Sequence, residues 1–424
     1  MKYNYEEVIH IIENTRRFGN LTGYEVSKQM LEQLGNPQSG IPFVHVAGTN
    51  GKGSTTAFLC KILEQTGKKV GMFTSPHLIT FEERIRINGV YISKEDVTRL
   101  GNLLLATEFA VSPTMFDYCL AMAVLYFKEQ QCDIIVMETG IGGRYDSTNA
   151  LGIPEVAVIT KIGFDHMAVL GNTLEEIAGE KAGIIKQSGR VVTSMQEPVV
   201  RDVLYHNFID VNGVQYHEIQ HSDIEEIKMI PMKMYGSYQL ENGATAVAAA
   251  KMLFEKWNDA QSFVTTKEQQ EMYIKKGLSE TFWKGRMEII NEDPFFMIDG
   301  AHNSHGVHAL AESLKALYPG EKFHFIMGVM ADKDYEEMIE ELLPLAIDFV
   351  TVTPESNRAL QSKDLAECIM KKGIEARYAE DMETVIRPFL TPSNYQAENK
   401  TIAFGSLYFI GAIETMIEEN SSKR

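Results

Sequence analysis

Residues 41–65 read IPFVHVAGTNGKGSTTAFLCKILEQ, and this stretch decides how the chain folds. The apolar run 41–47 suits a strand that helices cover on both faces, and residues 54–65 have the composition of a helix. Residues 48–54, at the junction of the two, include three glycines, a lysine and two hydroxyl residues. A strand that feeds a glycine-rich turn and then a helix exposes backbone N–H groups and the positive end of a helix dipole. This unit is typical of a phosphate-binding loop.

The loop departs from the strict GxxxxGK[ST] motif. Val46 occupies the first glycine position, and Gly53 separates Lys52 from Ser54. A glycine turn before a helix can also be a simple connection. The convergence of glycines, lysine and hydroxyls nevertheless favours nucleotide binding, in which Lys52 would reach the β- and γ-phosphates. We therefore predict a nucleotide site that includes Gly48, Thr49, Asn50, Gly51, Lys52, Gly53 and Ser54.

Further short apolar runs repeat the strand, loop and helix pattern and predict a mostly parallel sheet. The more polar stretch 205–235 interrupts this rhythm and favours an antiparallel hairpin or two. The pattern restarts near residue 295, so we predict one domain at residues 1–293 and a smaller, doubly wound α/β domain at residues 294–424. The expected strands are 41–47, 69–74, 133–139, 155–161, 295–299, 323–329, 349–353 and 401–405, and the expected helices include 5–17, 24–34, 54–65, 174–185 and 303–317.

The composition argues against some classes of binding partner. The formal net charge of −18 argues against a nucleic-acid surface, which needs a basic excess. No apolar run reaches the roughly 20 residues of a membrane helix, and the N-terminus lacks the apolar core of a signal peptide. The four cysteines are scattered and form no CxxC pair, as is usual in a reducing compartment. We expect a cytoplasmic protein that binds neither nucleic acids nor membranes.

Seven motifs, taken in order along the chain, resemble those of the folylpolyglutamate and dihydrofolate synthases of the Mur-ligase superfamily. Each motif alone is weak, but together they span residues 48 to 408. The resemblance implies a phosphate-loop Mur-ligase ATPase domain with a folate site at 1–293, and a Rossmann-like glutamate ligase domain at 294–424. The motifs are GTNGKGS (48–54), TSPHL (74–78), ETGIGGR (138–144), GFDH (163–166) with EKAGI (180–184), DGAHN (299–303), DKD (332–334) and FGSLY (404–408).

The resemblance also implies the reaction. ATP would phosphorylate the terminal γ-carboxylate of a reduced folate, and the amine of L-glutamate would displace the phosphate, giving a folylpolyglutamate and ADP. We expect a monomer whose partners are these small molecules. An enzyme that also uses dihydropteroate is the main alternative.

Other classes fit the residues less well. A GTPase switch would need an [NT]KxD motif, and Thr160-Lys161-Ile162-Gly163 has glycine in place of the acid. A dinucleotide-dependent oxidoreductase would need a complete GxGxxG, and residues 140–144 give only a fragment. A phosphate-loop pseudoenzyme would bind ATP without turnover.

Activating a carboxylate with ATP requires hard cations, and Mg²⁺ takes oxygen ligands. From the residues alone, Glu138 could be a solvated strand-end glutamate, His166 a structural histidine and Lys181 a solvated helix lysine. The resemblance implies instead that Ser75 and Glu138 hold one Mg²⁺, that Glu138 and His166 hold a second, and that Lys181 is carbamylated by CO₂. Carbamylation requires a neutral amine and hence a lowered pKa. The predicted catalytic residues are Lys52, Glu138, His166 and Lys181.

The remaining nucleotide contacts are predicted on four residues. Asn242 begins an alanine-rich helix and could be a simple N-cap; the resemblance places it near the adenine. Arg286 is expected near the phosphates, although it could be a solvated charge. Asp299 ends a strand, where open α/β sheets place ligand groups, and is expected to accept from a ribose hydroxyl. His302 is a candidate ATP contact.

The acceptor site is expected near the loop after Ser75 and at the start of the helix after residue 114. Phe116 could stack on a pterin ring, although core packing would explain it equally well. Asp117 replaces a glutamate that is usual in the family, and residues 145–149 read YDSTN where LDATN is common. These departures leave the preferred folate open. The predicted substrate contacts are Pro76, His77, Thr114, Phe116, Asp146 and, for glutamate, Lys333.

Overall fold

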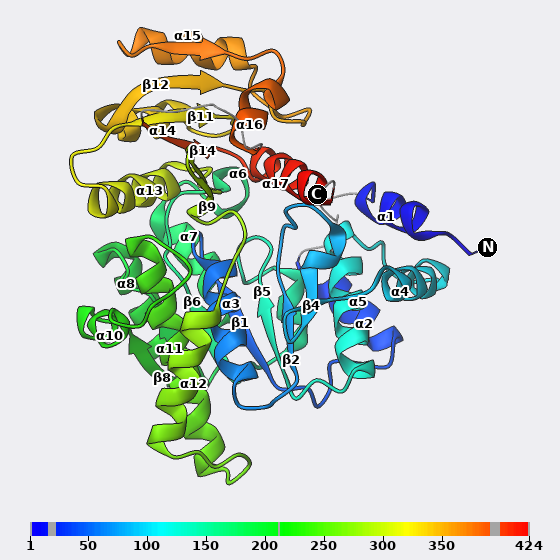
Figure 1. Cartoon of the computed structure of the whole chain (residues 1–424). Helices are drawn as coiled ribbons and strands as arrows, with labels where there is room; N and C mark the ends of the chain where they lie inside the picture. Colours follow the sequence, from blue (N-terminus) through cyan, green and yellow to red (C-terminus); the bar gives the residue numbers. More distant parts are fainter. Residues whose placement is uncertain (1, 16–22, 211–212, 391–398, 423–424) are drawn as a thin grey trace. The chain divides into compact units, whose positions relative to one another are not determined.

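The computed structural model describes residues 2–15, 23–210, 213–390 and 399–422, and the chain forms two compact units (Figure 1). The first unit comprises Met1–Lys233 and Leu240–Thr281, and the second comprises Met234–Gln239 and Phe282–Arg424. The helix α11 (Ser237–Asp259) therefore starts with residues of the second unit and continues into the first.

The first unit is built on an eight-stranded sheet in the order β4-β3-β2-β5-β1-β6-β7-β8. Its six strands from β2 to β8 run parallel, and β3 and β4 add an antiparallel edge. The central strands β1, β2, β5 and β6 are buried along their whole length, as expected for strands covered on both faces. The strands are β1 (Phe43–Ala47), β2 (Val70–Phe73), β3 (Ile85–Ile87), β4 (Val90–Tyr91), β5 (Ile134–Glu138), β6 (Val156–Ile159), β7 (Arg190–Thr193) and β8 (Gln215–Glu218).

Helices pack on this sheet and on one another. The helix α3, which follows the glycine loop, packs against α12, and a Cβ on Gly277 of α12 would lie 2.6 Å from the Cα of Ile62. This close approach requires glycine. The helices of the unit are α1 (Tyr5–Glu13), α2 (Glu25–Gln33), α3 (Lys52–Glu64), α4 (Lys94–Ala106), α5 (Met115–Glu129), α6 (Met167–Leu170), α7 (Leu174–Lys181), α8 (Pro198–Leu204), α10 (His221–Ile227), α11 and α12 (Lys267–Glu280), with short helical turns η1 (Phe81–Arg84), η2 (Ser147–Leu151), η3 (Ala182–Ile184) and η4 (Tyr205–Ile209).

The second unit contains a six-stranded sheet in the order β13-β12-β11-β14-β10-β9, parallel except for β9. Its core is rich in phenylalanine, including a stacked pair, Phe325 and Phe349. The strands are β9 (Glu288–Glu292), β10 (Phe295–Ile298), β11 (Phe323–Met327), β12 (Ala346–Thr351), β13 (Ala376–Tyr378) and β14 (Lys400–Phe404). The helices are α13 (Ser304–Leu317), α14 (Tyr335–Leu342), η5 (Leu343–Leu345), α15 (Ser362–Lys371), α16 (Met382–Leu390) and α17 (Leu407–Ser422).

Several expectations differ from the structure. The stretch 205–235 holds no antiparallel hairpin in its described residues; it contains η4, α10 and β8, and β8 extends the parallel sheet beside β7. Asn242 does not begin a helix, because α11 starts at Ser237, directly after Gly236 with φ +101°. The predicted division after residue 293 falls between β9 and β10. These two strands pair with each other, and the second unit already resumes at Phe282. Residues 16–17 of the first expected helix lie outside the described residues.

In the part of the chain that the structure describes, no helix combines the length and the apolar character needed to cross a membrane.

Candidate active site around the glycine loop

The glycine loop joins β1 to α3, and two of its glycines have positive φ. Gly48 has φ +153° and Gly51 has φ +85° at the N-cap of α3. A Cβ would lie 1.8 Å from Thr160 Oγ1 at Gly48 and 2.2 Å from Asn242 Oδ1 at Gly51. Side chains are therefore excluded at both positions. Asn242 thus lies against the phosphate loop itself, at the junction where α3 begins.

Part of the loop backbone is already engaged. The amides of Thr49 and Asn50 both donate to the carbonyl of Lys161, at 3.0 and 3.2 Å. The hydroxyl of Thr49 donates to the Gly163 carbonyl at 2.9 Å. These bonds fasten the loop to the segment after β6. The Thr49 and Asn50 amides therefore point toward Lys161, whereas the N-terminus of α3 presents the positive end of a helix dipole.

Two lysine ammonium groups converge on one carbonyl of the loop. Lys52 Nζ donates to the carbonyls of Gly48 and Thr49 at 3.2 and 3.1 Å, and Lys181 Nζ donates to the Gly48 carbonyl at 2.8 Å. Lys181 ends α7 and is 3% exposed. Burial, together with the charge of Lys52, lowers the pKa of Lys181 to about 7. A lysine of this kind is partly neutral near neutral pH, as attack on CO₂ requires.

Glu138 lies at the carboxyl end of β5, next to the loop. In the sheet register it pairs with Val46, two residues before Gly48. Its side chain is 4% exposed, and its Oε2 accepts from the Ser75 backbone N–H at 3.3 Å. The structure therefore brings together Ser75 and Glu138, both carrying hard oxygen atoms of the kind that Mg²⁺ prefers.

His166 lies beyond the end of β6, at the start of a short helix. The strand β6 ends at Ile159, and His166 is the N-cap of α6, with φ +52° and ψ +34°. Its backbone N–H donates to Asp165 Oδ1 at 2.8 Å, and its Nε2 lies 4.0 Å from Asp165 Oδ2. Over the described ranges, no three His, Cys, Asp or Glu side chains form a ready metal-binding group. A site here would need substrate oxygens to complete it.

Two of the predicted acceptor residues, Thr114 and Phe116, lie at the start of α5, and a third, Asp146, shares the neighbour Gly140 with Phe116. Thr114 caps that helix through a reciprocal bond with Asp117. Phe116 packs on Phe73 with ring centroids 5.6 Å apart, and a Cβ on Gly140 would lie 2.9 Å from its ring. Asp146 accepts from the Gly140 N–H at 2.8 Å. Phe116 and Asp146 therefore both border the glycine segment that follows Glu138.

His77, directly after Pro76, is held by a separate set of contacts. His77 Nδ1 accepts from Arg84 Nε at 2.9 Å, and its ring lies near Phe81. Burial and the neighbouring Arg84 charge lower the pKa of His77 to about 4. The imidazole is thus neutral near pH 7 and acts as an acceptor.

In the second unit, two predicted residues, Asp299 and Arg286, lie close to Gly300, just beyond the carboxyl end of β10. Asp299 is 3% exposed and accepts from Tyr238 Oη, Met287 N and Ala301 N, each at 2.8 Å. A Cβ on Gly300 would lie 1.9 Å from Arg286 Nη1, so the guanidinium lies against that glycine.

The other two predicted residues of this unit lie in neighbouring turns. His302 Nδ1 donates to the Gly300 carbonyl at 2.8 Å, which places its ring directly after Asp299. Lys333 lies in the turn between β11 and α14, where its N–H donates to the Met330 carbonyl at 3.2 Å. Tyr238, an anchor of Asp299, was missed by sequence reasoning because no motif marks it.

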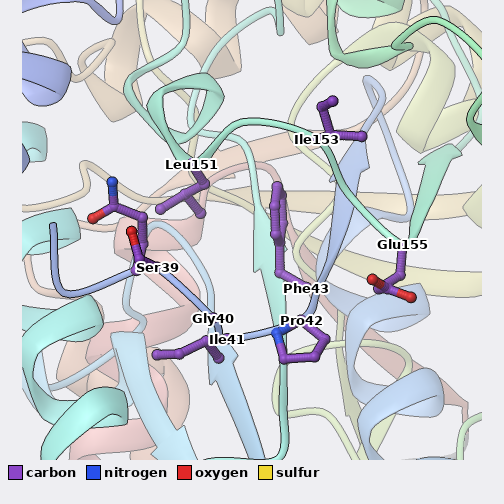
Figure 2. Close-up of a pocket in the computed structure, with 9 residues that line it drawn as sticks. Ser39, Gly40, Ile41, Pro42, Phe43, Leu151, Ile153 and Glu155 are labelled. Atoms are coloured by element: carbon purple, nitrogen blue, oxygen red, sulfur yellow. The ribbon is translucent and has the colours of Figure 1, made fainter. Parts of the chain in front are cut away.

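A separate hollow of about 350 Å³ lies at the opposite end of β1 from the glycine loop. Figure 2 shows Phe43, Leu151 and Ile153 around it, with Glu155 at one side. None of the predicted site residues lines it. It therefore contributes nothing to the site described above.

Comparison with known proteins decides the family. Residues 46–250 match the Mur ligase middle domain, and residues 285–404 match the Mur ligase glutamate ligase domain. The chain is 35% identical to the dihydrofolate synthase/folylpolyglutamate synthase of Bacillus subtilis, with 98% of this chain and 99% of that protein covered. The chain belongs to the folylpolyglutamate synthase and dihydrofolate synthase family. It is also 30% identical to the folylpolyglutamate synthase of Lacticaseibacillus casei, covering 97% of this chain and 98% of that one.

A solved structure of this family has the same fold. The Mycobacterium tuberculosis folylpolyglutamate synthase complexed with ADP and AMPPCP superposes with a TM-score of 0.84 at 26% identity, covering 97% of this chain and 98% of that one. The predicted family is confirmed. So is the predicted fold class of two α/β domains with mostly parallel sheets.

Proposed function

We propose that the protein is an ATP-dependent ligase that joins L-glutamate to the γ-carboxylate of a reduced folate, forming ADP and phosphate. Membership of the folylpolyglutamate synthase and dihydrofolate synthase family supports the predicted ligase class. The observation that carries the proposal is the geometry at the carboxyl ends of two neighbouring central strands. There β1 delivers a glycine loop whose Gly48 carbonyl accepts from both Lys52 and Lys181, and its neighbour β5 delivers a buried carboxylate, Glu138.

A carboxylate does not react with an amine at neutral pH, so it must first be activated. In the proposed first step an oxygen of the folate carboxylate attacks the γ-phosphorus of ATP, and ADP leaves. Charge on the transferring phosphoryl group needs positive neighbours that are already in place. Lys52, now bound to the carbonyls of its own loop, is placed to exchange those contacts for phosphate oxygens.

The second step forms the amide. The neutral amine of glutamate attacks the acyl-phosphate carbon, the nitrogen loses one proton, and the tetrahedral intermediate collapses. Phosphate leaves with the oxygen that it received from the carboxylate. His302 and Lys333 are the proposed contacts for ATP and for the incoming glutamate. Asp299 is the proposed contact for the ribose, and Arg286, which lies nearby, is the proposed contact for the phosphates.

Mg²⁺ fits the residues at the loop. Ser75 and Glu138 are neighbours through the Ser75 backbone N–H, both carry hard oxygen donors, and Mg²⁺ needs only one or two such groups besides phosphate and water. We propose that Ser75 and Glu138 hold one ion and that Glu138 and His166 hold a second. The ions would neutralise phosphate charge. The Ser75 N–H bond orients the Glu138 carboxylate for this purpose.

Carbamylation of Lys181 is part of the same proposal. The reaction joins the neutral amine to the carbon of CO₂ with loss of one proton, and it turns a cation into an anion next to Gly48. The pKa of about 7 that burial gives Lys181 supplies the neutral amine. We further propose that the protein acts as a monomer in the cytoplasm.

A bifunctional enzyme is the second candidate function. It is favoured by the Bacillus subtilis relative, which is named for both activities and is covered over nearly its whole length. The test incubates the protein with ATP, Mg²⁺ and glutamate, with a reduced folate and dihydropteroate in parallel, and follows product masses. Glutamyl additions to folate alone support a dedicated polyglutamate synthase, and additions to both support the bifunctional enzyme. ATP binding without any addition would contradict both.

A further inference from the structure

A buried histidine lies in the strand that leads to the glycine loop. His45, in the middle of β1, has no exposed surface, and its Nε2 lies 2.7 Å from Thr148 Oγ1. Thr148, in η2, is equally buried, and the two residues are 103 positions apart in the chain. No step proposed above uses either side chain.

Thr148 is in turn bonded to Asp146. Its hydroxyl and its backbone N–H both donate to Asp146 Oδ1, the latter at 2.9 Å. The other oxygen, Oδ2, accepts the backbone N–H groups of Gly140 and Ile141 at 2.8 and 3.0 Å. Asp146 is only 6% exposed, and burial raises its pKa; the four donors oppose this effect by stabilising the ionised carboxylate in place of water.

The direction of each bond follows from counting protons. An ionised carboxylate only accepts, so the single hydroxyl proton of Thr148 must point to Asp146. The Thr148 oxygen can then only accept from His45, which must carry its proton on Nε2. His45 Nδ1 is buried and has no hydrogen-bond partner among the described residues. Burial lowers the pKa of His45 to about 3, so the ring stays neutral and this tautomer persists through the physiological range.

This series of hydrogen bonds ends on the backbone segment that follows β5. Gly140 and Ile141 are the second and third residues after Glu138. Gly140 also lies against the Phe116 ring, where a Cβ would come within 2.9 Å. The path of this short segment therefore affects both the carboxylate beside the phosphate loop and the wall expected to face the acceptor.

We propose that His45, Thr148 and Asp146 form a positioning chain that fixes the 139–141 backbone and thereby holds Glu138 and Phe116 in place for the ligation. The catalytic part of this inference rests on the proposed function. The backbone-fixing part does not, and it can be tested alone. The chain runs from β1 to the segment after β5, so it ties together the two strands that carry the loop and the carboxylate.

The test uses hydrogen exchange and kinetics on the full-length protein. Thr148→Val keeps the shape but removes the hydroxyl proton, Thr148→Ser restores it, and Thr193→Val is the matched control. Thr193 is equally buried, and its hydroxyl pairs with Tyr216 Oη at 3.2 Å on the far strands of the same sheet. We expect Thr148→Val to speed exchange of the 139–146 amides by about 10-fold, as for loss of one bond to a charged group. We expect kcat to fall by about 10-fold with KM for ATP within about 2-fold.

Thr148→Ser should recover both values, and Thr193→Val should change neither. His45→Gln, which keeps an amide donor, should fall between wild type and Thr148→Val and serves if that variant does not fold. Wild-type exchange of the 139–146 amides in Thr148→Val, or an equal effect of Thr193→Val, would overturn the proposal. If the wild type shows no ligation, the proposed function fails, whereas the exchange result still decides the positioning chain.

Discussion

The buried ammonium group of Lys181 lowers the stability of the folded protein. Its folded pKa of about 7 lies below the value of about 10.4 for an unfolded chain. The unfolded state therefore binds more protons between these two values, and stability from this group rises with pH across that window. This loss of stability is fully present below about pH 7 and disappears near about pH 10.4.

We predict that Lys181→Met raises the free energy of unfolding by about 2–4 kcal/mol near pH 6 in CO₂-free buffer, and that this gain shrinks toward pH 9. Chemical denaturation at both pH values measures it. Lys186→Met is the control, since Lys186 is less buried and should give a smaller gain. If the variant is no more stable than wild type near pH 6, burial of the Lys181 ammonium does not destabilise the folded protein.

In the proposed mechanism, Lys52 and Glu138 act on the charge of the transferring phosphoryl group rather than on the fold. We predict that Lys52→Ala and Glu138→Gln each lower kcat by about 10²–10⁴-fold, because each removes a group that stabilises the transition state. Circular dichroism and thermal unfolding should stay close to wild type. Lys267→Ala, at an exposed position on α12, is the matched charge control and should keep full activity. Near-normal turnover in either site variant would remove these residues from the mechanism.

At the scale of elements, the start of α5 is joined to two other helical segments through Asp117. Its Oδ1 accepts from the hydroxyls of Ser27 on α2 and Ser147 on η2, the latter at 2.7 Å, while Oδ2 accepts from Thr114. Asp117 and Ser147 are both departures from the usual family sequence, and they contact each other. The two departures therefore form one local arrangement next to the expected acceptor wall.

We predict that Asp117→Asn lowers the free energy of unfolding by about 2–3 kcal/mol, since an amide cannot accept all of these bonds. Urea denaturation measures the loss. Asp96→Asn at the exposed start of α4, which also accepts from a helix-capping serine, should cost less than about 1 kcal/mol. Equal losses in the two variants would mean that the buried network adds nothing beyond ordinary capping.

Helices and strands could be predicted where the pattern of apolar and polar residues matches the burial of the element in the fold. β1, β5 and β6 are continuous apolar runs, so their burial between helices could be predicted. β8 is a partly exposed strand with the polar sequence QYHE, and its parallel pairing with β7 depends on contacts that no local pattern encodes. The start of α11 at Ser237 was missed because its first turn, SYQLEN, reads as polar loop.

The candidate site was predictable to a similar degree. The glycines of the loop and Glu138 could be identified from their positions at strand ends. The meeting of Lys181 with Gly48 spans 133 residues, and its lowered pKa depends on that burial. His45 carried one usable signal, a titratable residue within the apolar run FVHVA, but its partners could come only from the fold.

At the scale of the whole molecule, the net charge of −18 opposes the approach of anionic substrates. Local cations at the loop must act against this field, which salt screens over about 10 Å at 0.1 M. We predict that KM for the folate falls by about 2–5-fold as NaCl rises from about 10 to 150 mM at fixed Mg²⁺. Steady-state kinetics across that range tests it. A KM that rises with salt would mean that the site's own positive field dominates.

The central claim is that ATP activates the folate carboxylate directly. The measurement that tests it most directly uses a folate whose γ-carboxylate carries ¹⁸O in both oxygens, with mass analysis of the phosphate released. Because the attacking oxygen stays with phosphorus, each new amide should be accompanied by one phosphate containing a single ¹⁸O. Amide formation with unlabelled phosphate, or ATP hydrolysis without any amide, would contradict the account.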